Sequence, residues 1–167
     1  VASWLSLLPQ KVLFLLFALP QIFWNCKFRV TDKAVTNDLL EAVLPWIREK
    51  LTDHNKLEDV GISCVGFCFG GWQTAYTLAL ANKENLSFFH CGVGIHPSFR
   101  VERIHGRTED DLARQVGTRP LLLLPAGNDD LQPHSHEAVQ ILAHARGVPE
   151  EEIAINFPSM IHGWVTR

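Results

Sequence analysis

The chain has 167 residues, which is enough for one domain with a hydrophobic core. Apolar residues make up 47% of it and charged residues 20%, the balance of an ordinary globular protein. The formal net charge is −3, with no basic run and no interleaving of aromatic and basic residues. These features exclude the usual signature of nucleic-acid binding, and we expect no nucleic-acid partner.

The first residue is Val1 rather than Met, and the last motif ends at Arg167, so we expect a sequence truncated at both ends. Residues 12–26 form an uncharged run interrupted by Pro20. This run is shorter than the ~20 apolar residues that span a bilayer, so we expect no membrane association. A secretory signal segment is the alternative, but we favour a buried parallel strand over residues 12–18.

Cysteine usage gives an expectation for the compartment. The four cysteines show neither CxxC spacing nor the density of a small secreted scaffold: Cys26, Cys64, Cys68 and Cys91. We expect free thiols in a reducing environment, and therefore a cytoplasmic protein.

The remainder of the chain alternates between helix-like and strand-like patterns. In chain order we predict a helix over residues 31–51, a strand over 61–67, a helix over 71–81, a strand over 88–95, a polar irregular stretch with one short helix over 100–115, a strand over 121–124, a helix over 134–145 that ends at Gly147, and a strand over 153–157. Within the first helix, Asn37 and Asp38 are candidate starting residues and Pro45 a candidate kink.

This order predicts a single α/β domain with a mostly parallel sheet flanked by helices. In open sheets of this kind, catalytic groups sit at the carboxyl ends of the strands.

The segment Val65-Gly-Phe-Cys-Phe-Gly-Gly71 has the spacing of a nucleophile elbow centred on Cys68. Such an elbow is a sharp strand-to-helix turn in a strained conformation, and the glycines two positions before and after the nucleophile avoid Cβ clashes. Gly66 and Gly70 occupy those positions, and Gly71 lets the helix pack close to the sheet. The helix amino terminus favours thiolate over thiol. A phosphate-binding turn is the alternative.

A thiol nucleophile needs a base, and the base needs an orienting acid. In α/β-hydrolases these follow in the order nucleophile, acid, histidine. Asp129 comes just after the strand at 121–124, and His162 comes after the strand at 153–157. We therefore predict a triad of Cys68, Asp129 and His162.

Several alternatives remain open at this site. Asp130 would replace the predicted acid if the loop register differed by one residue, and His96 is the next-best base, although it precedes the acid. Taken alone, the predicted acid could be a turn residue and His162 an ordinary loop histidine. Trp72 and Trp164 flank the elbow and the histidine, where they would line the pocket or pack in the core.

We expect no metal site. His134 and His136 form an H-x-H pair at the start of a predicted helix, and residues two apart on a helix point in different directions.

Three motifs together resemble the dienelactone hydrolase family (carboxymethylenebutenolidase and its eukaryotic homologues). They are Gly66-Phe-Cys-Phe-Gly-Gly71, Gly127-Asn-Asp-Asp-Leu-Gln-Pro133 and His162-Gly-Trp-Val-Thr-Arg167. The resemblance covers residues 31–167, and residues 1–30 are atypical. It implies an α/β-hydrolase fold and a Cys–Asp–His triad that opens cyclic esters without a cofactor. Asp129 is favoured over Asp130 because the family's acid lies two residues after the glycine and four before the proline.

The resemblance also implies further site residues. The backbone N–H of Phe69 would be one oxyanion donor, and Arg167 is the nearest match to an arginine that binds the substrate carboxylate. The family's amino-terminal strands, a glutamate near the nucleophile and a second arginine are not recognisable in residues 1–30. We expect a monomeric hydrolase of a small ester or lactone. The alternatives are a non-catalytic or incomplete α/β-hydrolase remnant, and a cysteine-dependent thioesterase or peptidase.

Overall fold

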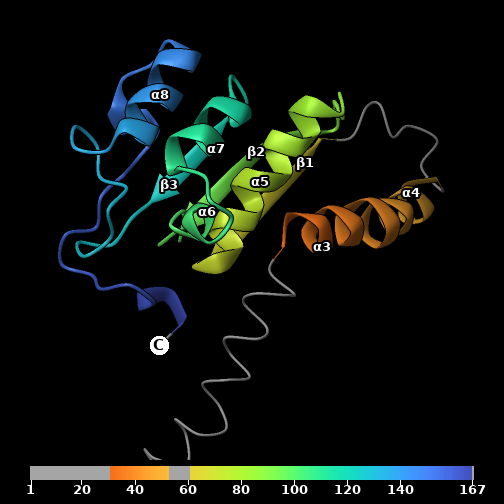
Figure 1. The fold of residues 1–167 in the computed structure, drawn as a ribbon, viewed down its shortest axis with the longest axis horizontal. Helices are drawn as coiled ribbons and strands as arrows, with labels where there is room; N and C mark the ends of the chain where they lie inside the picture. Colours follow the sequence, from red (N-terminus) through yellow and green to blue (C-terminus); the bar gives the residue numbers. More distant parts are fainter. Residues whose placement is uncertain (1–30, 53–60, 167) are drawn as a thin grey trace, which may run out of the picture.

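A three-stranded parallel sheet in the order β1-β2-β3 forms the centre of the protein (Figure 1). The strands are β1 (Ile62–Phe67), β2 (Phe89–Ile95) and β3 (Leu121–Leu124). Phe67 pairs with Ile95, and Ile95 pairs with Leu124, so the carboxyl ends of all three strands lie level at one edge. The predicted parallel α/β architecture is confirmed.

The computed structural model describes residues 31–52 and 61–166. The strand predicted over residues 12–18, Cys26 and Arg167 lie outside the described residues. The described helices are α3 (Asp32–Asn37), the π-helix η3 (Asp38–Val43), α4 (Leu44–Thr52), α5 (Phe69–Lys83), α6 (Val101–Ile104), α7 (Glu109–Val116), α8 (Glu137–Arg146), and the 3₁₀ turns Glu150–Glu152 and Trp164–Thr166.

Helix α5 packs on β1 and β2, and α7 lies between α5 and α8 (Figure 1). Because α5 is apolar on nearly every side, most of its length is buried in this layer. The largest fully buried side chains come from these helices, the strands and the loops between them: Trp72, Leu78, Phe89, Phe99, Leu112, Leu121, Leu123 and Leu142. The helices therefore bury one face of the sheet.

The other face of the sheet is more open among the described residues. Along β1, Gly66 is buried, whereas its neighbours Val65 and Phe67 are 59% and 41% exposed. Ile155, beyond β3, is 47% exposed. Side chains that alternate between the two faces of a strand thus meet a packed layer on one side and an open surface on the other.

The first helical segment starts earlier than Asn37 and Asp38, so that prediction is wrong. Thr31 is the N-cap, and its hydroxyl accepts a hydrogen bond from the backbone N–H of Ala34 at 3.1 Å. The helix is π-helical over η3, which ends two residues before Pro45. Proline lacks the N–H that a regular helical turn would use. A π-helical turn of this kind is a known accompaniment of helix bends.

Residues 100–115 contain two helices, α6 and α7, where we predicted one. The missed signal is a capping box. The Thr108 hydroxyl accepts from the Asp111 N–H at 3.2 Å, and the Asp111 carboxylate accepts from the Thr108 N–H at 3.1 Å.

The last predicted elements are shorter than expected. Residues 153–157 make two isolated parallel bridges, Leu123 with Ala154 and Ala126 with Phe157, rather than a full strand. Helix α8 begins at Glu137 instead of residue 134, and it ends at the predicted Gly147, which has a left-handed φ of 65°.

No helix in the part of the chain that the structure describes is both long enough and apolar enough to cross a membrane.

The Thr108→Ala substitution tests the α7 cap. It removes the hydroxyl acceptor at the start of the helix, and we expect the free energy of unfolding to fall by about 1 kcal/mol. Urea denaturation would measure this, with Thr118→Ala as the control, because Thr118 is exposed in the turn after the same helix. An equal loss in both variants would contradict the assignment of the cap.

Candidate active site

Cys68 occupies a strained turn between β1 and α5. Its φ of 53° and ψ of −116° lie in a region that non-glycine residues rarely adopt. Such a conformation costs about 1–3 kcal/mol and persists only where the surroundings hold it. Here the Cys68 N–H donates to the Ile95 carbonyl at 3.0 Å, and the Cys68 carbonyl accepts from the N–H groups of Gly71 and Ser98, each at 3.0 Å.

Two of the three elbow glycines are sterically required. A Cβ at Gly66 would lie 1.9 Å from the backbone oxygen of Gly70, and one at Gly71 would lie 2.7 Å from the Cβ of Pro97. A Cβ at Gly70 would meet nothing within 4 Å. The prediction that glycine at this position avoids a Cβ clash is therefore wrong. The turn therefore requires glycine at Gly66, at the end of β1, and at Gly71, where α5 approaches the loop after β2.

The structure brings Cys68, Asp129 and His162 into one hydrogen-bonded chain. The His162 Nε2 lies 3.1 Å from the Cys68 Sγ, and its Nδ1 lies 2.6 Å from the Asp129 Oδ1. Each residue follows a different segment of the sheet, so the level strand ends place them together. This is the connectivity of nucleophile, base and orienting acid.

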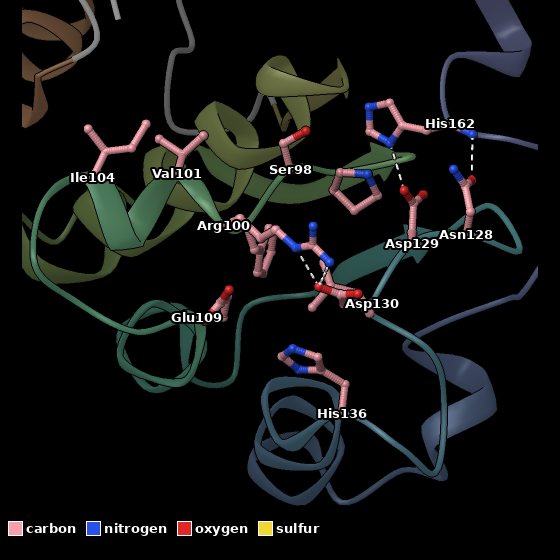
Figure 2. A pocket seen from close by; sticks show the side chains of 13 residues that line it. Ser98, Arg100, Val101, Ile104, Glu109, Asn128, Asp129, Asp130, His136 and His162 are labelled. Carbon is pink, nitrogen blue, oxygen red and sulfur yellow. Dashed lines mark hydrogen bonds and ion pairs between the residues drawn. The ribbon is translucent and has the colours of Figure 1, made fainter. Parts of the chain in front are cut away.

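Backbone contacts fix the acid and the base. The second carboxylate oxygen of Asp129 accepts a hydrogen bond from the Ala126 N–H at 2.8 Å. The side-chain oxygen of Asn128 accepts from the His162 N–H at 2.7 Å (Figure 2). Asn128 was not predicted, although its position beside Asp129 in the loop is the signal that could have found it.

The ambiguity between Asp129 and Asp130 is resolved by geometry. The Asp130 carboxylate turns away from His162 and forms an ion pair with the guanidinium of Arg100 (Figure 2). Asp129 is therefore the carboxylate in contact with the imidazole.

The surroundings of Cys68 favour its thiolate. Burial alone would raise the pKa of the thiol, but hydrogen bonds from Ser98, His162 and the Phe69 N–H outweigh this and lower it. The Ser98 Oγ lies 3.4 Å from the Sγ. We did not predict Ser98; its place just after β2, at the carboxyl edge of the sheet, is the signal that could have found it.

The pKa of His162 shifts in the opposite direction to that of Cys68. Burial acts to lower its pKa, but the hydrogen bonds to Cys68 and Asp129 and their negative charges raise it above the ordinary value. Thiolate and imidazolium therefore stabilise each other, with the carboxylate holding the ring from the far side.

His96, the alternative base, lies beside the triad without joining it. Its ring meets the edge of the His162 ring, with centroids 4.6 Å apart. Only 1% of the residue is exposed, and burial together with the nearby charge of His162 lowers its pKa. Among the described residues, neither of its ring nitrogens has a hydrogen-bond partner.

A cavity of about 380 Å³ opens beside the triad (Figure 2). Ser98 and His162, both in contact with the Cys68 thiol, form part of its wall. Val101, Ile104 and Leu131 supply apolar surface. A pocket of this size fits a small molecule.

Of the remaining predicted site residues, the two tryptophans lie away from the triad and Phe69 lies beside it. Trp72 is fully buried in the core, where its Nε1 donates to Glu102 at 2.6 Å. Trp164 stacks on Phe157 with centroids 5.0 Å apart and is not part of the cavity wall. Phe69 is the first residue of α5, so its N–H is free of helical partners and close to the thiol.

The H-x-H pair does not form a joint site in the structure. His134 precedes α8 and contacts the Glu151 carboxylate at 2.6 Å, whereas His136 caps the helix and accepts from the Ala138 N–H.

No family model, curated protein or solved structure matches the chain. The resemblance to dienelactone hydrolases therefore rests on the three sequence motifs.

Substitutions at two glycines test the elbow. In Gly66→Ala the new methyl group meets backbone atoms that cannot move away, and we expect the free energy of unfolding to fall by about 3 kcal/mol. Gly70→Ala is the matched control, because its methyl group meets open space and alanine is the better helix former. Urea denaturation of both variants would measure the difference. Equal stabilities would contradict the close approach at Gly66.

Thiol alkylation tests the electrostatics. The pKa of Cys68 is lowered and that of Cys64 is raised, the latter by burial and by Cys91, so at mildly acidic pH Cys68 holds the larger thiolate fraction. We expect iodoacetamide to modify Cys68 first, with the preference shrinking as pH rises toward the ordinary thiol pKa of about 8.5. Peptide mass spectrometry would follow each thiol.

His162→Ala is the informative variant in that experiment. It removes a hydrogen bond and a positive charge from the thiolate, so alkylation of Cys68 at acidic pH should slow. All three described thiols are partly exposed, so access alone does not produce the preference. Equal labelling of these thiols in the unmodified protein would contradict an assembled site.

Proposed function

We propose that this protein is a hydrolase of carboxylic esters, lactones among them, in which Cys68 is the nucleophile. The observation that carries the proposal is the continuous chain of hydrogen bonds from the Cys68 Sγ through His162 to Asp129. The strained turn at Cys68 and the motif resemblance to dienelactone hydrolases support it. The parallel sheet and the order nucleophile, acid, histidine also support an α/β-hydrolase fold.

The first half-reaction forms an acyl-enzyme. The Cys68 thiolate attacks the carbonyl carbon, a C–S bond forms, and the carbonyl electrons move to oxygen. The Phe69 N–H, at the start of α5, is placed to donate a hydrogen bond to this oxyanion. The ester C–O bond then breaks, and His162 gives its Nε2 proton to the departing alkoxide. In a lactone the alcohol stays attached to the acyl group.

The second half-reaction uses His162 as a base. Its neutral imidazole removes a proton from water, and the hydroxide attacks the thioester carbonyl. The C–S bond breaks, which releases the carboxylic acid and restores the thiolate beside the imidazolium. Asp129 keeps the ring in one orientation through both halves, because its second oxygen is tied to the Ala126 N–H.

The cavity supports a small substrate rather than a polypeptide. Its volume of about 380 Å³ lies near the lower end of the range for small-molecule sites. Its walls combine apolar side chains with the paired charges of Arg100 and Asp130, so a compact, partly polar ester fits them.

Turnover of p-nitrophenyl acetate and of a dienelactone by the full chain would test the proposal. In Cys68→Ala we expect kcat/KM to fall by about 10³-fold or more, because alanine has no nucleophilic atom to form the acyl-enzyme. Asp129→Asn should also lose most activity while keeping the fold. Cys91→Ser is the control, because this thiol contacts Ser63 away from the triad.

Undiminished turnover in Cys68→Ala would overturn the proposal. A protein whose Cys68 is readily alkylated but which hydrolyses neither ester would instead fit the reading as a non-catalytic remnant. Turnover of thioesters or peptides in place of esters would redirect the proposal to the other classes that share this triad.

A further inference from the structure

We propose that Cys68, His96 and His162 form a binding site for a thiophilic divalent metal ion with the chemistry of Zn²⁺. One ligand atom from each residue, the Cys68 sulfur and a ring nitrogen of each histidine, lies within 4.8 Å of the other two. The site includes two members of the triad, but its third ligand, His96, is not used by the proposed hydrolysis.

The unpartnered ring of His96 is a second observation that points to a bound metal ion. It is 99% buried, and neither ring nitrogen has a hydrogen-bond partner among the described residues. An unsatisfied buried polar group costs about 1–3 kcal/mol, and such groups in folded proteins call for a physical explanation. The residue also has a φ of 39°, a left-handed conformation that is uncommon for residues other than glycine. A metal ion would give one of these nitrogens its partner.

The spacing is close to that of a tetrahedral zinc site. With Zn–S near 2.3 Å and Zn–N near 2.0–2.1 Å, neighbouring ligand atoms are roughly 3.3–3.6 Å apart. The Cys68 Sγ and His162 Nε2 are 3.1 Å apart, and no pair of ligand atoms exceeds 4.8 Å. The longest separation therefore exceeds the ideal by about 1.5 Å at most, which side-chain movement can close.

The donor set selects the class of metal. One thiolate and two imidazoles suit Zn²⁺, whereas Mg²⁺ and Ca²⁺ require oxygen ligands. The Asp129 carboxylate accepts from the Nδ1 of His162, and this outer contact is the one that commonly orients a zinc-binding histidine. Three protein ligands leave the fourth position for water.

Metal binding has a consequence for the proposed hydrolysis. An ion held by the Cys68 sulfur and the His162 Nε2 occupies the nucleophile and the base together, so we expect Zn²⁺ to inhibit. This consequence rests on the proposed function, whereas binding itself does not. A spectroscopic measurement therefore separates the two.

Cobalt substitution of the full chain provides that measurement. Co²⁺ added to the unmodified protein should give a thiolate-to-cobalt charge-transfer band and the intense visible bands of tetrahedral coordination. Cys68→Ala should lose the charge-transfer band, and His96→Phe should lose the tetrahedral bands while keeping the ring volume. His144→Ala is the control, because this histidine is exposed on α8, away from the site.

Affinities would be measured by competition between the protein and a chromophoric chelator for Zn²⁺. We expect His96→Phe to bind at least about tenfold more weakly, since even the loss of an outer contact typically costs 10–100-fold. His96→Asn is a second variant in case the phenyl ring disturbs folding, because asparagine tolerates positive φ.

Mg²⁺ should neither bind nor inhibit. In the unmodified protein, Zn²⁺ should suppress ester turnover, and a chelator should restore it.

Two results would overturn the proposal. One is equal Zn²⁺ affinity in folded His96 variants and the unmodified protein, which would show that His96 is not a ligand. The other is equal affinity in Cys68→Ala, which would place the metal elsewhere. If the protein has no ester turnover at all, the cobalt spectrum still decides whether the site binds metal, so failure of the proposed function is distinguishable.

Discussion

The backbone of Cys68 is the constraint on which the site depends. Its positive φ directs the thiol out of the sheet at the start of α5, and the surrounding contacts keep it there. Those contacts reach the end of β2 through Ile95 and Ser98, so the first two strands and the helix are tied together at one point. Gly66 and Gly71 are small because backbone and proline atoms approach them closely. The strain at one residue is thus supported by several ordinary interactions around it.

The acid and the base depend on a second set of contacts at the same edge of the sheet. The loop after β3 holds Asp129 through the Ala126 N–H, and it holds the backbone of His162 through Asn128. One short loop therefore positions both partners of the thiol. The neighbouring Asp130 is paired with Arg100, which leaves a single carboxylate facing the imidazole. Because Arg100 balances the charge of Asp130, Asp129 is the carboxylate that acts on the imidazole of His162.

Local patterns in the sequence were sufficient for much of this arrangement. The four leucines of β3 and the glycine spacing around Cys68 predicted the strand and the turn, because both signals are contained within a few residues. Long-range packing accounts for what was missed. Trp72 could have faced a pocket or the core, and only the buried carboxylate of Glu102, thirty positions away, decides for the core. The contact of Ser98 with the thiol and the burial of His96 likewise depend on how the end of β2 lies beside β1 and β3.

The separation of the reactive groups along the chain has a consequence for biosynthesis. The contact between Cys68 and His162 joins residues 94 positions apart. Closing a loop of that length costs about 4 kcal/mol of chain entropy, so the contact forms only once the sheet beneath it supports both ends. On the ribosome, Cys68 emerges well before its base, and domains fold as units. Until His162 docks, the thiol lacks one of the hydrogen-bond partners that favour its ionised form. The full thiolate character of Cys68 is therefore acquired at the end of folding, when the native contacts of the thiol are in place.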